Sequence, residues 1–263
     1  MTNEEYIKAA DMRRSRRTYR SQPLDSQTMG AIKGLVDIVN EKTGLAFRFI
    51  EKGSFAFTVF TGNFSVIAVC GEDSERARIK AGYFGEMIVL ECVYHGLGTC
   101  WVSGTYNENK MLDYLKLPKN QRLYAVIVIG NVKRELSLKE KVMYNVTHKQ
   151  NKPYQKMFEA CDAKLPPHYE FAMKLVEKAP SGTNDRPVHF RFENGVLLAY
   201  VDAPYSDKSI DFGIAQFHFC IGAQAKGVKG EWDSKGRFCP ENSKSDELSD
   251  NDNKEEDVNN EQD

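Results

Sequence analysis

Apolar residues recur at three- and four-residue spacing from Met29 to Asn40, which predicts an amphipathic helix that Asp25 or Ser26 can cap. A longer stretch, Arg76–His95, is apolar on nearly every side and is too long for a strand. It predicts a helix buried at the centre of the fold, which Gly96 is placed to end. Alternating or continuous runs of β-branched and aromatic residues predict strands at Phe47–Glu51, Ala56–Phe60, Ser65–Val69 and Leu123–Ile129.

The second part of the chain repeats this order loosely. The pattern predicts a helix at His168–Ala179, a hairpin at His189–Val201 that turns at Asn194-Gly195, and a second central apolar helix at Ile210–Ala225. Each central helix is followed by a glycine turn and a tryptophan, in G-L-G-T-C-W and in K-G-V-K-G-E-W. This shared order favours an internal duplication with halves at 1–150 and 151–235, the alternative being two unrelated helix ends that share glycine and tryptophan.

The composition changes sharply near the end of the chain. Residues 241–263 hold ten acidic residues, two lysines and almost nothing apolar, and we expect a disordered acidic tail within 236–263. The tail could bind a partner, but a solvated extension is the simpler interpretation. Residues 1–240 keep 34 Lys+Arg against 27 Asp+Glu, a surplus of about +7 that suits an anionic cofactor or substrate.

Composition also argues against several classes of protein. The 263 residues suffice for one large domain or two small ones, and the formal net charge of -1 gives no overall attraction to nucleic acid or to a membrane surface. No apolar run approaches the ~18 residues of a membrane span, and the acidic N-terminus is unlike a signal peptide. The six cysteines form no C-x-x-C pair, which argues against a zinc site or a disulfide framework. We therefore expect a cytoplasmic protein without a metal ion.

The segment R-R-S-R-R-T-Y at 13–19 packs four arginines and two aliphatic hydroxyls into seven residues. Guanidinium groups bind phosphate bidentately, and a serine adds a short hydroxyl donor. Arginines this close repel one another unless an anion lies among them. The alternative is a solvated basic patch, or arginines on a helix surface paired with Glu4 and Glu5. Within this segment the candidate phosphate ligands are Arg13, Ser15 and Arg17, and Arg14 is a further candidate for binding the same ligand.

Three further segments are candidates for a ligand site. A turn stiffened by two prolines is expected at 179–187, A-P-S-G-T-N-D-R-P. It could bind the polar edge of a heteroaromatic ring, or it could be an ordinary loop between a helix and a strand. The small residues of G-L-G-T-C-W at 96–101 could lie along a planar ligand, or they could simply end the preceding helix. The lysines of L-K-E-K at 138–141 could reach a phosphate, or they could be ordinary surface lysines. The candidates are Pro180, Ser181, Gly182 and Asn184; Gly96, Leu97, Gly98 and Thr99; and Lys139 and Lys141.

Together the four segments, within residues of about 10–235, resemble the nitroreductase-like flavoprotein family. R-R-S-R-R-T-Y is similar to the family's N-terminal phosphate-binding signature. A-P-S-G-T-N-D-R-P is similar to its A-P-S-x-x-N-x-Q-P-W turn, with Arg186 in place of Gln and Val188 in place of Trp. G-L-G-T-C-W, and V-I-V-I-G followed by L-K-E-K, resemble its other two segments. The resemblance implies an FMN cofactor held by the candidate residues.

The segments are distributed differently from the family pattern. In the family, each subunit of a homodimer carries all four segments, and both subunits hold each flavin. Here the first half has the arginine signature without the A-P-S turn, and the second half has the turn without the signature. This chain most resembles the branch with two half-size repeats in one chain. The resemblance implies an α+β fold of two related half-domains, with mostly antiparallel sheets and long central helices packed as an intramolecular pseudo-dimer. It would hold one FMN and be a monomer, the alternative being a homodimer through another face.

The resemblance implies an NAD(P)H-dependent FMN oxidoreductase. Hydride would pass from NADH or NADPH through flavin to a small (nitro)aromatic or quinone-like acceptor in ping-pong fashion, with no nucleic-acid or membrane partner. The alternative is a non-catalytic flavin-binding or sensor protein, which the replacements at Arg186 and Val188 favour. No side chain is singled out as a catalytic acid or base, because His95, His189 and His218 lie in apolar stretches typical of core histidines.

Overall fold

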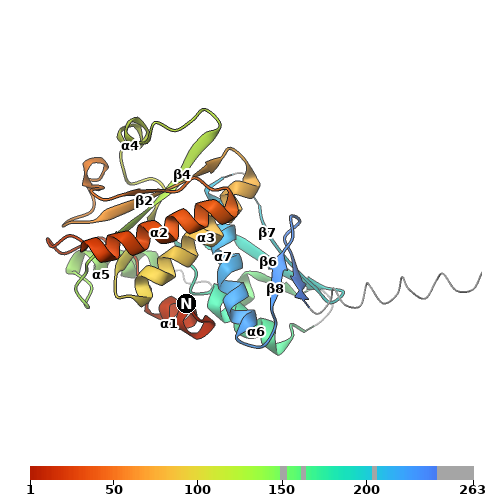
Figure 1. The fold of residues 1–263 in the computed structure, drawn as a ribbon. Coiled ribbons are helices and arrows are strands. Elements are labelled where there is room, and N and C mark those ends of the chain that lie inside the picture. Colours follow the sequence, from red (N-terminus) through yellow and green to blue (C-terminus); the bar gives the residue numbers. More distant parts are fainter. Residues whose placement is uncertain (149–152, 161–163, 203–205, 242–263) are drawn as a thin grey trace, which may run out of the picture.

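The computed structural model describes residues 1–148, 153–160, 164–202 and 206–241. Two long helices, α3 (Glu75–Tyr94) and α7 (Asp207–Gln224), pack against each other at the centre, with one β-sheet on either side of the pair (Figure 1). Both helices were predicted within a few residues of their observed bounds. Among the residues that the structure describes, no helix combines the length and the apolar character needed to cross a bilayer.

The first sheet is antiparallel throughout, with strand order β1-β2-β4-β3. Its strands are β1 (Arg48–Ile50), β2 (Ser65–Glu72), β3 (Gly98–Val102) and β4 (Gln121–Gly130). The central strands are buried on both faces: Ile67 of β2 packs in the core shared with α3, and Val66 packs in the core of the opposite face. Helix α2 (Ser26–Thr43) packs against α3 and β1, and the Asp25 carboxylate caps it by accepting from Thr28 N.

The predicted strand at Ala56–Phe60 is wrong. A 3-10 turn, η1 (Ser54–Ala56), is followed there by irregular chain with a single β-bridge from Phe57 to Tyr106. The aromatic residues that suggested a strand instead form a cluster, in which the Phe57 ring lies 5.4 Å from that of Phe60 and 5.6 Å from that of Phe64. This cluster belongs to the hydrophobic core on the outer face of the first sheet. The aromatic residues are therefore apolar because they pack on the sheet, although they do not form one of its strands.

The second sheet has strand order β5-β6-β7-β9-β8, with only the β5–β6 pair parallel. Its strands are β5 (Phe158–Ala160), β6 (Val188–Glu193), β7 (Val196–Val201), β8 (Gly230–Trp232) and β9 (Arg237–Pro240). The β6–β7 hairpin turns at Asn194-Gly195, where both residues have positive φ (50° and 77°), as predicted for a type I′ turn. Strand β9 carries the folded chain to Pro240, beyond the expected limit of 235, and the remaining tail at 242–263 lies outside the described residues.

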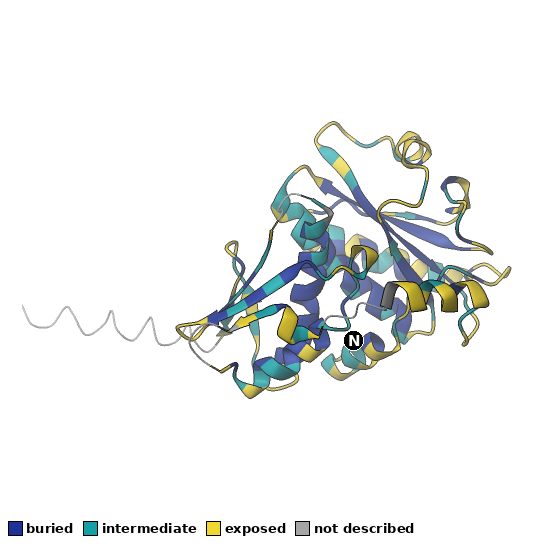
Figure 2. Ribbon diagram, turned by 180° about the vertical axis from the view of Figure 1, so that it is seen from behind, coloured by how far each residue is buried: buried dark blue, intermediate teal, exposed yellow. Residues whose placement is uncertain are grey.

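The other helices are α1 (Asn3–Met12), α4 (Glu108–Leu115), α5 (Leu138–His148) and α6 (Pro167–Val176), with short 3-10 turns η2 (Tyr154–Lys156) and η3 (Gly182–Asn184). Helix α6 packs against α7, as α1 does against α3. Buried residues concentrate on the central helices and the sheet strands (Figure 2). One hydrophobic core includes Ile88 of α3 together with Ile214 and Phe217 of α7, so the two parts of the chain are joined by shared core packing.

Two glycines let α3 and α7 touch backbone to backbone. A Cβ atom added to Gly82 of α3 would overlap the carbonyl oxygen of Ile210, and one added to Gly213 of α7 would overlap the carbonyl oxygen of Ile79. Because any side chain at these positions would push the helices apart, the close crossing depends on glycine at both.

Candidate functional site

The arginine segment leaves the end of α1 as extended chain and runs beside β3. Arg13 is the C-cap residue of α1, Ser15 forms a parallel bridge with Thr99, and the amide of Arg16 donates to the carbonyl of Thr99 at 2.8 Å. The arginines therefore do not lie on a helix surface beside Glu4 and Glu5. The arginine segment therefore extends the first sheet at its edge strand β3. This places the arginine motif next to the G-L-G-T-C-W motif.

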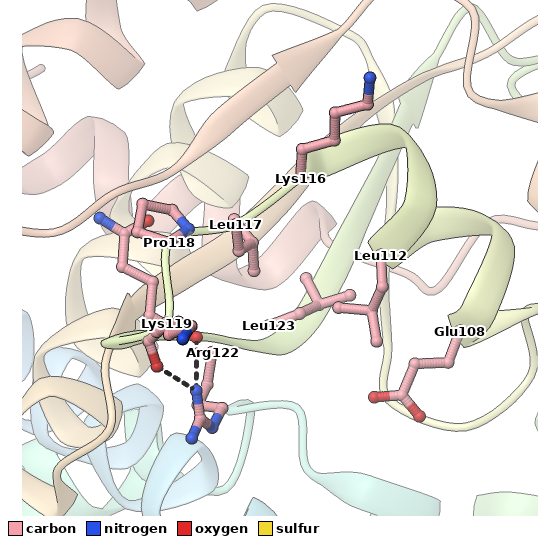
Figure 3. A pocket seen from close by; sticks show the side chains of 9 residues that line it. Glu108, Leu112, Lys116, Leu117, Pro118, Lys119, Arg122 and Leu123 are labelled. Atoms are coloured by element: carbon pink, nitrogen blue, oxygen red, sulfur yellow. Dashed lines mark hydrogen bonds between the residues drawn. The ribbon is translucent and has the colours of Figure 1, made fainter.

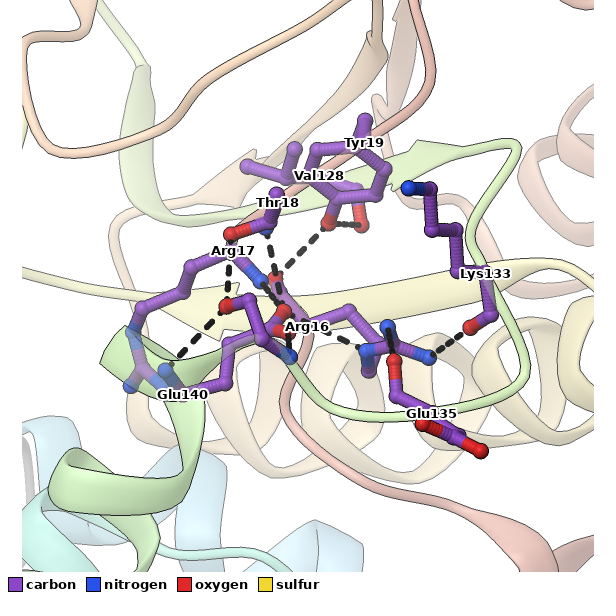
Figure 4. Close-up of polar contacts among 9 residues, drawn as sticks. Arg16, Arg17, Thr18, Tyr19, Val128, Lys133, Glu135 and Glu140 are labelled. Carbon is purple, nitrogen blue, oxygen red and sulfur yellow. Dashed lines mark hydrogen bonds and ion pairs between the residues drawn. The ribbon is translucent and has the colours of Figure 1, made fainter.

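Arg16 and Glu140 anchor this segment (Figure 4). The buried Arg16 guanidinium binds Glu140 Oε1 at 3.2 Å and donates to the carbonyls of Lys133 and Glu135. The same carboxylate accepts from the amides of Arg17 at 2.7 Å and Thr18 at 3.0 Å. Burial by itself would raise the pKa of Glu140, but hydrogen bonds from these amides, from the Ser137 amide and from Arg16 lower it to about 2.

Glu140 lies in the L-K-E-K motif but was not predicted as a site residue. Its bonds fasten the start of α5 to the arginine segment, so the motif's lysines flank that segment. Lys139 donates to the carbonyl of Val59 at 2.9 Å, and Lys141 is exposed. Arg16, which is not among the candidate ligands, uses its donors within the protein.

Arg13 connects the arginine segment to the second half of the chain. Its side chain is 13% exposed, and its Nη2 donates to the carbonyl of Lys178, the residue before Ala179 of the A-P-S turn, at 3.4 Å. Lys178 also forms an ion pair with Asp11 of α1. The Nε atom of Arg13 is buried 3.8 Å from Glu86 and makes no hydrogen bond within the described part of the chain. A buried guanidinium with an unused donor is an incomplete arrangement that an anion can complete.

Ser15, Arg17 and Cys100 gather next to Arg13. Burial raises the pKa of the Cys100 thiol, while the charges of Arg17 and Arg13 and a hydrogen bond with Ser15 oppose the rise. Arg13, Ser15 and Arg17, the phosphate candidates within the arginine segment, therefore lie near one buried sulfur. Arg14 is exposed, and it donates to the carbonyls of Asp11 and Arg13.

The predicted A-P-S turn is held in a strained conformation. Thr183, Asn184 and Arg186 have φ of 50°, 63° and 52°, a left-handed region that costs roughly 1–2 kcal/mol for each non-glycine residue. The Gly182 amide donates to both oxygens of the Asp211 carboxylate at 3.1 and 3.2 Å, and Ser181 Oγ accepts from the amide of Arg186 at 2.9 Å. Strain of this kind concentrates at functional sites, where surrounding contacts hold it.

The turn borders a small hollow and contacts α5. Pro180, Ser181, Arg186 and Asp211 are among the residues that line the hollow. Helix α5, whose first turn carries Lys139 and Lys141, also contacts the Gly182–Asn184 turn. The bond from Arg13 to the carbonyl of Lys178 brings the arginine segment next to the A-P-S turn, although these two residues are 165 positions apart in the chain.

The G-L-G-T segment has a clear packing role. Gly96 has φ of 82° where α3 ends, and Leu97 packs against the core. Gly98 and Thr99 are buried in β3, where a Cβ atom on Gly98 would overlap Val132. Contact between this segment and a planar ligand stays a prediction.

A separate hollow of about 360 Å³ lies between the end of α4 and the start of β4 (Figure 3). It is lined by Leu112, Lys116, Leu117, Arg122 and neighbouring residues, none of which belongs to the predicted site. Among the described residues, no group of three or more His, Cys, Asp or Glu side chains could hold a metal ion.

Two buried polar residues meet here, Glu86 of α3, which was not singled out from the sequence, and His218 of α7, which was expected only as a core histidine. Both are fully buried, and they bind each other at 3.0 Å beside Arg13. The signals that could have found this pair are the acids Glu86 and Glu91 within the apolar stretch of α3 and the histidine within that of α7. The expectation that His218 is satisfied within the core is confirmed.

Comparison with known proteins concerns the fold and the family of the chain. A "putative nitroreductase" of Thermotoga maritima has the same fold, with a TM-score of 0.61 and 18% identity over 91% of this chain and 94% of that one. An FMN-dependent nitroreductase of Clostridium difficile R20291 matches at a TM-score of 0.40 and 16% identity, over 56% of this chain and 99% of that one. A search of curated proteins gave no significant match. Residues 5–223 match the family model described as "Putative TM nitroreductase", and the chain therefore belongs to this nitroreductase family of oxidoreductases.

Proposed function

We propose that the chain is an NAD(P)H-dependent FMN oxidoreductase with one composite flavin site at the junction of its two halves. The observation that carries the proposal is the contact of Arg13 with Lys178, which joins the arginine segment to the A-P-S turn. In this proposal, one polypeptide supplies what two subunits supply in dimeric relatives. A cytoplasmic location is part of the proposal and rests on the cysteine usage.

The residues present fit a phosphate-bearing flavin. The unused Nε donor of Arg13, the Ser15 hydroxyl and Arg17 would bind the phosphate, with Lys139 and Lys141 adding positive charge. Arg14 would contribute its charge from the surface. Gly96, Leu97, Gly98 and Thr99 on one side and Pro180, Ser181, Gly182 and Asn184 on the other would border the ring.

Bound FMN would supply the redox chemistry, taking hydride from NADH or NADPH and passing it to a small (nitro)aromatic or quinone-like acceptor in a ping-pong exchange. The protein's part is to bind and orient. The strained turn, held by Asp211 through the Gly182 amide, would present fixed backbone groups to the ring edge. No side chain is assigned as a catalytic acid or base.

The test is the visible absorption spectrum of the purified chain together with the flavin released per chain. We expect one FMN per chain. Two flavins per chain, or FAD, would contradict the single composite site. Addition of NADH or NADPH without oxygen should then bleach the flavin band, and an acceptor should restore it.

The second candidate is a non-catalytic flavin-binding or sensor protein. It is favoured by Arg186 and Val188, which stand where the family pattern has Gln and Trp. Arg186 is engaged within the turn, since its Nη2 donates to the carbonyl of Glu177 at 2.6 Å. Bound flavin that neither NADH nor NADPH bleaches would support this alternative over the enzyme.

A further inference from the structure

Glu86 is a buried carboxylate in contact with groups from three other parts of the chain. Its Oε2 accepts from the indole nitrogen of Trp101 at 2.8 Å, and its Oε1 lies 3.0 Å from His218 Nε2 and 3.8 Å from Arg13 Nε. Glu86 and His218 are fully buried, and Arg13 is nearly so. The first half of the chain supplies Glu86, Trp101 and Arg13, and the second supplies His218.

The position of the protons on His218 follows from its neighbours. The Nδ1 atom lies 3.1 Å from the carbonyl oxygen of Leu175, which only accepts hydrogen bonds, so Nδ1 carries a proton. The Nε2 atom faces a carboxylate oxygen, and a proton must lie between these two atoms for them to bond. The indole N–H and the Arg13 charge both stabilise an ionised Glu86, which places this second proton on His218.

This protonation decides how much charge Arg13 offers to a ligand. Without the proton between Glu86 and His218, the Glu86 carboxylate would cancel the charge of Arg13, and the three residues together would carry none. With His218 charged, Glu86 and His218 cancel each other, and the three carry one positive charge. The other charged or ionisable groups that act on Arg13 are Arg14 and the Cys100 thiol.

We propose that Glu86 and His218 form a neutral ion pair that positions Arg13 while leaving its positive charge available to the phosphate of the flavin. The proposal rests on the proposed function. Glu86 and His218 are positioning residues that act through Arg13. The pair also couples the phosphate site to the packing of α3 on α7, because each helix supplies one member.

The binding experiment compares FMN with riboflavin, which lacks the phosphate. The dissociation constants of both are measured on the flavin-free full-length chain and on variants His218→Gln and Glu86→Gln/His218→Gln. In His218→Gln the negative charge of Glu86 is no longer balanced by His218 and offsets the positive charge of Arg13. We therefore expect FMN to bind roughly tenfold more weakly, with the affinity for riboflavin unchanged. In the double variant both charges of the pair are absent, and FMN affinity should return to within about threefold of the parent.

Two results would overturn the proposal. An equal loss for FMN and riboflavin in His218→Gln would indicate a packing defect, and a double variant no better than the single one would show that charge is not the cause.

A third measurement does not depend on flavin. The ¹⁵N spectrum of the flavin-free chain at neutral pH should show one histidine, absent from His218→Gln, with both ring nitrogens protonated. A bare Nε2 on that histidine would contradict the ion pair. If the parent binds no flavin, the proposed function fails, and this spectrum still decides whether the pair exists.

Discussion

Gly213 of α7 lies so close to Ile79 of α3 that a Cβ atom added to Gly213 would overlap the carbonyl oxygen of Ile79. The proposed composite site would depend on this contact. The first half brings the arginines on chain that packs with α3, and the second brings the A-P-S turn held by Asp211 of α7. We expect Gly213→Ala to lower the free energy of unfolding by about 3 kcal/mol, since the backbone of α3 cannot yield as a side chain would. Urea denaturation measures the effect.

Gly30→Ala is the matched control for that variant. Gly30 also lies within a helix, α2, but a Cβ atom there would meet nothing within 4 Å. We expect it to raise the free energy of unfolding by about 0.5–1 kcal/mol, because alanine favours a helix over glycine. Equal effects of the two substitutions would contradict the close helix crossing.

Glu140→Gln should destabilise the protein at neutral pH by about 1.5–3 kcal/mol, because the buried carboxylate accepts several charge-assisted hydrogen bonds. The folded-state pKa of about 2 lies below the ordinary value of 4.5. The stabilisation is therefore fully present above pH 4.5 and is lost as the pH falls towards 2. The measurement is denaturant unfolding of parent and variant from pH 7 to pH 2.5, where the difference should shrink. Glu135→Gln, at an exposed residue in the loop before α5, is the control and should change little.

Arg17→Ala should weaken FMN binding roughly ten- to hundredfold, because one charged contact to the phosphate is lost. Riboflavin binding should change far less. Arg20→Ala removes a charge from the same segment, but Arg20 is exposed and its Nε donates to the carbonyl of Val132, so its effect should be small. Isothermal titration with both flavins distinguishes these outcomes, and equal losses in the two variants would point to general surface charge.

Asp211→Ala should weaken FMN and riboflavin alike, by about fivefold, because the A-P-S turn loses the acceptor of its Gly182 amide. The common loss is expected because the proposed contact of the turn is with the ring and not with the phosphate. Asp211→Asn keeps an acceptor oxygen and should restore most of the affinity. A loss confined to FMN would place Asp211 at the phosphate instead.

The chain should bind flavin as a monomer, because α3 and α7 already bury each other within one polypeptide. Light scattering on the flavin-bound chain, and on a version that ends before Glu241, measures the mass and any contribution of the acidic tail. Flavin release on dilution, in step with dissociation of a dimer, would show that the site spans two chains.

The periodic parts of the chain could be predicted from the sequence. Apolar spacing located α2, α3 and α7, and Asn194-Gly195 located a hairpin turn, because helix periodicity and turn chemistry are local properties. The arginine segment and the A-P-S turn were also visible as segments suited to a ligand. Their convergence was expected from the resemblance, and the bond from Arg13 to the carbonyl of Lys178 is its first structural support.

By itself the sequence determined the two central helices and the candidate segments, which depend on neighbours along the chain, and the fold class followed from the family resemblance of those segments. Only the tertiary structure decided three contacts. Arg16 binds Glu140, Phe57 and Phe60 pack on a sheet without being part of it, and Glu86 binds His218. Each of these depends on groups that are distant in sequence and buried together. A buried charge or polar group must find a partner wherever the fold brings one, and the spacing of residues along the chain does not say which partner that will be.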